Sequence, residues 1–311
     1  MGISARSLYY WQKQLNNEKL NVPVTKTVAP PANKLRPEEK KAVVSALLNS
    51  EWIDLSPREI YYKLLDDEAT VIASVSTFYR VARQSNLLGN RSKFTSGKKL
   101  NRETPHLVAL APNEVWSWDV SQIRSTIRLE RYFLYVIMDI WSRFVVGWKL
   151  EAHEKTDFAI KLWKEALENQ AISGNGLINH KDNGALMTSD EMIKFVHDAK
   201  MVDSYSRAGV SDDNPFSESL FGTIKRFRDF PECFEELSSG RVYFEQYFKA
   251  YNFHYKHSGI QFLEPATRHY GEEEKVLNKR NKVIQEFHDK NSHRYSSQPK
   301  SFKPIREVKI N

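Results

Sequence analysis

The sequence predicts an α/β protein in which a three-stranded β-meander is continued by alternating helices and strands, with a helical region before it. Residues 115–150 contain three runs rich in Val, Ile, Tyr, Phe and Trp, the residue types that favour strands. From residue 155 onward, helical and strand patterns alternate, which is typical of α/β crossovers. Residues 36–90 instead show helix start signals and apolar residues at helical spacing.

Length and charge narrow the class of protein. The 311 residues carry 46 Lys and Arg against 39 Asp and Glu, a formal net charge of +7, which points towards a polyanion such as nucleic acid. The one cysteine excludes an intramolecular disulfide and a cysteine-based zinc site. No stretch reaches the ~18–20 consecutive apolar residues of a membrane span. We expect a protein of the cytoplasm, associated with the nucleoid and not with a membrane.

The first ninety residues are predicted to be helical around a linker. An isolated helix is expected over residues 7–15, and residues 21–35 contain three prolines and no periodicity, as a linker does. A helix follows over 37–48. The next opens at Ser56 with Pro57 and Glu59, the pattern of a capping box.

The third helix of this region suggests DNA binding. It begins at Ser74 or Ser76 and carries Arg80 and Arg83, so residues 36–90 fit a helix-turn-helix whose last helix contacts DNA through these arginines. A small helical bundle is the alternative. No acidic residue occurs between Ala69 and Arg102, and residues 91–111 are therefore assigned as a basic linker.

The remaining elements follow in the order βββ-α-β-α-β-α. Thr188 and Glu191 have the spacing of a capping box at the start of the second helix, and the last helix starts at Asn214-Pro215. The expected strands cover 115–123, 131–140, 143–150, 176–180 and 201–205, and the expected helices cover 155–169, 188–199 and the segment from 214.

Three carboxylates lie in unusual places. Asp119 falls inside the apolar strand WSWDVSQI, Asp182 directly follows a short strand, and Glu218 flanks the buried stripe of a helix. Each alone reads as an ordinary surface or capping carboxylate, but together they favour a bound cation. Oxygen ligands without cysteine suit Mg²⁺, and two such ions can assist phosphodiester displacement.

The helix that carries Glu218 also offers groups for a phosphate. Lys225 lies seven residues after Glu218, only about 20° away around a helix, and Asn214 lies one turn before it. The face with Glu218 therefore presents an amide and a cation. A plain solvated lysine is an equally good interpretation of Lys225.

The chain resembles a transposase of bacterial insertion sequences, a second-frame product with a retroviral-integrase-type core. The resemblance covers residue 55 to the end, and 35 residues separate Asp182 from Glu218, as in that family. In the second motif Lys181 stands where the family usually has Ser, and Gln261 stands where it usually has Arg. The motifs that carry it are PNEVWSWDV (112–120), FLYVIMDIWSRFVVGW (133–148), HKDNG (180–184), SDDNPFSESLFGTIK (211–225) and YNFHYKHSGI (251–260).

The resemblance implies an RNase H-like integrase catalytic core, with a mixed five-stranded sheet flanked by helices. In the sequence this core is preceded by the helix-turn-helix region. It implies Mg²⁺-dependent DNA cleavage and joining of a 3′ end to target DNA. Asp119, Asp182 and Glu218 become metal ligands for two Mg²⁺ ions, for which Mn²⁺ can substitute. Lys225 becomes a DNA contact near the active site, and we also assign Asn214 and Asn183 as DNA contacts.

The same resemblance sets the expected organisation and partners. Residues 1–20 resemble the end of a helix-turn-helix whose other half is missing, 112–272 form the core, and 273–311 form a basic C-terminal tail. The partners are double-stranded DNA, at terminal inverted repeats and at the target, further copies of the chain on DNA, and an upstream-frame DNA-binding product. Two alternatives stay open: a nuclease of RNase H type that cuts without joining, and a catalytically silent DNA-binding regulator.

Overall fold

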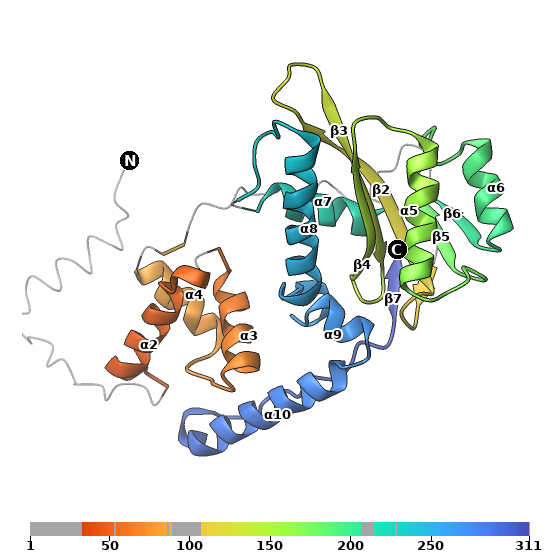
Figure 1. Cartoon of the computed structure of the whole chain (residues 1–311). Helices are drawn as coiled ribbons and strands as arrows, with labels where there is room; N and C mark the ends of the chain where they lie inside the picture. Colours follow the sequence, from red (N-terminus) through yellow and green to blue (C-terminus); the bar gives the residue numbers. More distant parts are fainter. Residues whose placement is uncertain are drawn as a thin grey trace, which may run out of the picture.

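The computed structural model describes residues 33–310 except 53, 86, 89–106, 207–213 and 228. A three-helix module lies to one side of a sheet that has helices on both faces, and the long helix α10 runs past the module (Figure 1). The helix predicted over 7–15, and most of the two predicted linkers, fall outside the described residues.

The three-helix module agrees with the helices expected from the sequence. Ser56 and Glu59 form the capping box, because the Ser56 hydroxyl accepts from the Glu59 amide at 3.2 Å and the Glu59 carboxylate accepts from the Ser56 amide at 2.6 Å. Ser74 caps the third helix by accepting from the Thr77 amide. The buried face of Phe78 holds the helices together. The helices are α2 (Pro37–Leu47), α3 (Pro57–Asp67) and α4 (Val75–Gln84).

The sheet is mixed and five-stranded, as predicted, with the strand order β4-β3-β2-β5-β6. Strands β2, β3 and β4 form the antiparallel meander. Strand β5 then pairs with β2 in parallel, and β6 pairs with β5 in parallel. The strands are β2 (Val115–Arg124), β3 (Arg131–Asp139), β4 (Val145–Glu151), β5 (Ile178–Lys181) and β6 (Val202–Tyr205).

Two layers of helices cover the two faces of this sheet (Figure 1). Trp116 and Trp118 of β2 are fully buried against Trp163 of α5 on one face. On the other face, α7 and α8 pack on β2 and β4. Because side chains alternate along a strand, residues 117, 119 and 121 of β2 belong to the face that α7 covers. These helices are α5 (Thr156–Asn169), α6 (Asp190–Asp198), α7 (Pro215–Lys225) and α8 (Leu237–Phe253).

The N-terminal capping residue of α6 lies one position later than predicted. Ser189, not Thr188, is the capping residue, and its hydroxyl accepts from the Met192 amide at 3.4 Å. The Thr188 hydroxyl instead donates to the carbonyl of Gly184 at 3.1 Å. Local hydrogen bonds from a side chain to the backbone compete with capping. Here such a bond engages the Thr188 hydroxyl and leaves Ser189 to cap the helix.

The segment predicted as a basic tail is folded in this structure. It follows α9 (Pro265–His269) and contains α10 (Glu273–Lys290) and β7 (Val308–Ile310). Strand β7 pairs in antiparallel fashion with β1 (Leu107–Ala109), the strand that precedes the core. Among the described helices, α10 included, we find none with the length and apolar character needed to cross a membrane.

The three-helix module docks on the C-terminal arm (residues 254–310, with α9, α10 and β7), chiefly through α3, while Glu39 of α2 also pairs with Arg294 at 2.9 Å. Asp66 accepts two hydrogen bonds from the guanidinium of Arg280, at 2.6 and 2.8 Å, and one from the ammonium of Lys256 at 2.7 Å. The side chains of Arg280 and Asp66 are 0% and 8% exposed. Beside them the ring of Tyr62 stacks on Phe262 with centroids 4.5 Å apart. The module is therefore held by a desolvated ion network and an aromatic stack.

Candidate active site on strands β2 and β5

Adjacent parallel strands position the first two predicted acids. Asp119 lies in the middle of β2, and Asp182 follows the last residue of β5. Ser117 of β2 pairs with His180 of β5. Asp119 and Asp182 each lie two residues after this pair, and because the strands are parallel they lie at the same level of the sheet. Sequence reasoning placed both residues correctly on their elements, and the sheet register sets them side by side.

Helix α7 is fixed across β2 by polar contacts on both sides of Asp119. The Ser117 hydroxyl donates to the side-chain oxygen of Asn214 at 2.6 Å and lies 2.7 Å from the Ser217 hydroxyl. At the other end of the helix, the Lys225 ammonium donates to the Ser121 hydroxyl at 2.8 Å. Both anchors lie on the strand face that also bears Asp119.

This register places the third acid opposite the first. Glu218 follows Asn214 by one helical turn and precedes Lys225 by seven residues, so all three share one side of α7. The two ends of that side contact β2 at Ser117 and Ser121. Glu218 therefore lies between these anchors, over the part of β2 that carries Asp119.

The electrostatics agree with this proximity. Burial and, to a smaller extent, the negative charges of Asp182, Glu218 and Glu154 together raise the pKa of Asp119 to about 7, against a hydrogen bond from the Val120 amide that lowers it. A buried carboxylate close to other carboxylates is stabilised by a cation or a proton. The charge pattern is that of a cation site.

The donor set fits a hard divalent cation, because all three groups are carboxylates and such ions prefer oxygen ligands. Over the described ranges, no group of three or more His, Cys, Asp or Glu side chains is already arranged to hold a metal ion. Drawing three carboxylates to one point without a cation is opposed by their mutual repulsion. The structure thus brings the acids into electrostatic range but does not form a closed cage.

The residues predicted to contact DNA have different environments. Asn214 is 1% exposed, and its amide donates to the Trp118 carbonyl at 3.3 Å, so it joins α7 to β2 and does not present its side chain to DNA. Lys225 and Asn183 are exposed near the acids, while Arg80 and Arg83 lie on the exposed face of α4 in the separate module.

Sequence reasoning missed the hydroxyl groups around the acids. Ser117 and Ser121 anchor α7, and the hydroxyl of Ser206, after β6, donates to Asp182 Oδ1 at 2.7 Å. The pattern Ser-x-Asp-x-Ser over residues 117–121 was the available signal, because alternate residues of a strand share a face.

A second polar group lies in the turn between β3 and β4 and has a structural role. Asp139 is fully buried and accepts from the amide and the hydroxyl of Ser142, at 2.7 and 2.6 Å, and from the Asn113 amide at 2.7 Å. The Ser142 hydroxyl also lies 2.9 Å from Nδ1 of His269, whose Nε2 is 2.8 Å from the side-chain oxygen of Gln170. This network ties the turn to α9 and α5.

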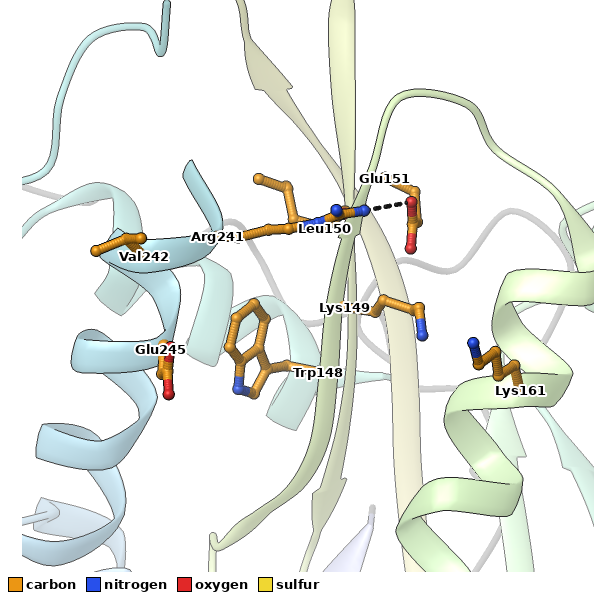
Figure 2. A pocket seen from close by; sticks show the side chains of 8 residues that line it. All are labelled: Trp148, Lys149, Leu150, Glu151, Lys161, Arg241, Val242 and Glu245. Carbon is orange, nitrogen blue, oxygen red and sulfur yellow. Dashed lines mark hydrogen bonds and ion pairs between the residues drawn. The ribbon is translucent and has the colours of Figure 1, made fainter. Parts of the chain in front are cut away.

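A groove runs along the edge strand β4 (Figure 2), and none of the three acids lines it. In it Arg241 donates to the Leu150 carbonyl at 3.0 Å and to the Glu151 carboxylate at 2.7 Å. These bonds cover part of an otherwise open strand edge, which limits pairing with other strands. The groove is lined by Trp148, Lys149, Leu150, Glu151, Lys161, Arg241, Val242 and Glu245.

Comparison with known proteins identifies the sheet region. Residues 109–211 match the family model described as an integrase core domain. The chain is 29% identical over 193 residues to the transposase for insertion sequence element IS904 of Lactococcus lactis, a match that covers 57% of this chain and 72% of the relative. It is 27% identical over 138 residues to the IS629 transposase of Shigella sonnei, covering 44% of each chain. It is 28% identical over 119 residues to the InsF transposase of IS3A of Escherichia coli, covering 38% of this chain and 40% of that relative.

Solved structures give similar but more distant matches. The HTLV-2 integrase catalytic core domain in complex with magnesium is 19% identical, with a TM-score of 0.39, and the match covers 51% of this chain and 98% of that one. A chain in the structure of the simian T-cell lymphotropic virus intasome in complex with PP2A regulatory subunit B56 gamma is 16% identical, with a TM-score of 0.43, and the match covers 69% of this chain and 74% of that one. The integrase core domain and these sequence relatives support a bacterial insertion-sequence transposase with an integrase-like core, a polynucleotidyl transferase.

Proposed function

We propose that this transposase cleaves DNA at the ends of an insertion sequence and joins the 3′ end to target DNA, with Asp119, Asp182 and Glu218 at the reacting phosphate. The observation that supports this most is the position of α7, which is fixed to β2 on both sides of Asp119 so that Glu218 lies opposite it. Asp182, on the neighbouring parallel strand, completes the set.

The three carboxylates would hold two Mg²⁺ ions, or Mn²⁺ in their place. When bound, such a pair activates the attacking oxygen and stabilises the leaving oxygen of a phosphodiester. The chain's own contribution is orientation. The Val120 amide donates to Asp119 Oδ1 at 2.7 Å, the Ser206 hydroxyl donates to Asp182 Oδ1 at 2.7 Å, and the two anchors of α7 position Glu218.

DNA contacts are proposed at two places. Near the acids, the exposed side chains of Lys225 and Asn183 would contact the strand that reacts. In the module, Arg80 and Arg83 on the exposed face of α4 would contact the terminal inverted repeat. Since α3 is the helix whose side chains join α10, docking leaves this face of α4 open to DNA.

Assembly on DNA follows from the number of active sites. Joining two ends of an element requires two reacting centres, and this chain supplies one set of three acids. We therefore propose that the active complex contains at least two protomers bridging two DNA ends at the nucleoid. An upstream-frame DNA-binding product is proposed as a further partner, because residues 1–20 resemble half of a helix-turn-helix.

A gel assay with a labelled terminal-repeat duplex and a plasmid target tests the reaction. Asp119→Asn, Asp182→Asn and Glu218→Gln keep side-chain size, and each should abolish cleavage and joining in Mg²⁺ while DNA binding persists. Asp198→Asn is the control, because Asp198 is an exposed acid of the same core with a side chain 64% accessible, and it should react normally.

The reaction products distinguish the three candidate functions: transposase, nuclease and catalytically silent regulator. Joined product supports the transposase reaction, cleaved product without joining indicates a nuclease, and binding without any product indicates a silent regulator. If one of the three acid variants cleaves at nearly the wild-type rate, that residue is not a required metal ligand.

A further inference from the structure

Ser206, the residue that follows β6, contacts three successive residues at the end of β5. Its hydroxyl donates to Asp182 Oδ1 at 2.7 Å. Its amide donates to the carbonyl of Lys181 at 2.9 Å, and its carbonyl accepts from the side-chain amide of Asn183. Ser206 is 4% exposed, so its hydroxyl has little access to water as an alternative partner, which strengthens its hold on the Asp182 carboxylate.

A buried ion pair fixes β6 relative to β5 just before this contact. The ammonium of Lys181, with a side chain 0% exposed, lies 2.8 Å from Asp203 Oδ1 of β6. The same carboxylate accepts from the amide of Asn179 at 2.9 Å and from the hydroxyl of Tyr205 at 3.1 Å. In the strand register Asp203 pairs with Asn179 and Lys181 pairs with Tyr205, so the ion pair runs diagonally over two register positions. The position of Ser206 against Asp182 is therefore set by a rigid strand pair.

We propose that Ser206 is a positioning residue for Asp182. The Ser206 hydroxyl donates to Oδ1 of Asp182 and so fixes the rotation of the carboxylate. Oδ2 of Asp182 then remains available to bind a divalent cation together with Asp119. Hydrogen bonds to ligating carboxylates orient the ligands, and their loss typically weakens metal binding by about 10–100-fold. The inference rests on the proposed function, because it takes Asp182 to be a metal ligand.

The chain supplies a matched control on the same strand. Ser204 lies two residues earlier, and its hydroxyl is 3.1 Å from Nδ1 of His180 instead of Asp182. Removing either hydroxyl deletes one part-buried hydrogen bond between the β5 and β6 segments. A general loosening of the strand pair would therefore affect both variants alike, whereas positioning of Asp182 depends on Ser206 alone.

The test measures Mn²⁺ binding to the full chain by titration calorimetry without DNA, and repeats it for Ser206→Ala, Ser204→Ala and Ser206→Thr. We expect Ser206→Ala to raise the dissociation constant for Mn²⁺ by about 10-fold or more, while Ser204→Ala stays within about 2-fold of wild type. Ser206→Thr retains the hydroxyl and should restore binding. Thermal unfolding of each variant verifies that the fold is kept.

Cleavage provides a second readout. The Mg²⁺ concentration for half-maximal cleavage should rise in Ser206→Ala, whereas the rate at saturating Mg²⁺ should change much less. Wild-type Mn²⁺ binding by Ser206→Ala, or equal weakening by Ser204→Ala, would overturn the inference even if the wild-type chain cleaves and joins DNA. Weakened Mn²⁺ binding in Ser206→Ala alone would support it even if the wild-type chain forms no product, which would refute the proposed function instead.

Discussion

Asp66→Asn should release the three-helix module from the C-terminal arm without disturbing either part. The substitution keeps the shape of the side chain but removes the charge that Arg280 and Lys256 share. Loss of one member of a buried ion pair costs about 3–5 kcal/mol, because the partner stays buried without a counter-charge. Lys256 keeps Glu264 at 3.1 Å, so the main loss falls on Arg280.

The lower end of that range is therefore expected, about 3 kcal/mol, which reduces the docking equilibrium by about two orders of magnitude. The neighbouring acid provides the control. Asp67 forms an exposed pair with Lys63 at 3.0 Å, with side chains 46% and 31% accessible, and such pairs contribute only about 0.3–0.5 kcal/mol. Asp67→Asn should leave the docked arrangement intact.

Hydrogen exchange of the α3 and α10 backbones, with the radius of gyration from small-angle scattering, measures docking directly. Exchange should rise in both helices of Asp66→Asn, while the helices of the sheet region keep their protection. Equal exchange in the Asp66→Asn and Asp67→Asn variants would refute the reasoning, because it would mean that the ion network does not hold the module.

The pH dependence of docking follows from the same network. Burial of Asp66 opposes ionisation, but the hydrogen bonds and charge of Arg280, and then the charge of Lys256, lower its pKa below the ordinary value of 3.8. A lowered pKa stabilises the docked state above the unfolded-state value, and this stabilisation is lost as the pH falls through the lowered pKa. Acid should therefore undock the wild type below about pH 4, whereas Asp66→Asn should lack this transition.

Three further predictions concern packing, DNA binding and assembly. Gly240→Ala in α8 would place a methyl group 2.6 Å from a methyl carbon of Leu150. Overpacking of this kind should lower the free energy of unfolding by about 1–3 kcal/mol, measured by urea titration. An unchanged urea midpoint would contradict this prediction. Arg80→Ala and Arg83→Ala should each reduce the slope of log affinity against log salt by about 1, because each removes one phosphate contact; an unchanged slope excludes that arginine. Mixing Asp119→Asn with wild type should depress joining by more than dilution, and a strictly linear loss would exclude cooperation between protomers.

Local signals were sufficient for most elements of the core. The aromatic and β-branched runs located the meander, and the pattern at Ser56 located the start of α3, since these features depend on residues close in the chain. Asp119, Asp182 and Glu218 could also be selected, because a carboxylate in an apolar strand, at a strand end or beside a buried helix stripe is unusual on its own. Their mutual placement required the sheet register.

The rest depended on distant partners. Asn214 was expected to contact DNA because it lies one helical turn before Glu218, but the Ser117 hydroxyl and the Trp118 carbonyl bind its side chain in the interior. The role of residues 273–310 was equally hidden. From the sequence alone, Arg280 is indistinguishable from a solvated surface cation. Its partner Asp66 lies 214 residues away in the chain, and only the fold brings the two together.

The same sequence separation has a consequence for the order of biosynthesis. A ribosome that adds about 5–20 residues per second completes the three-helix module roughly 10–40 s before Arg280 emerges, since Arg280 lies 214 residues after Asp66. Strand β1 waits for β7 almost as long, because Leu107 pairs with Ile310 near the end of the chain. A nascent or truncated chain therefore carries the three-helix module without the arm that holds it. The orientation of that module towards Asp119, Asp182 and Glu218 is established only when Arg280 has been added.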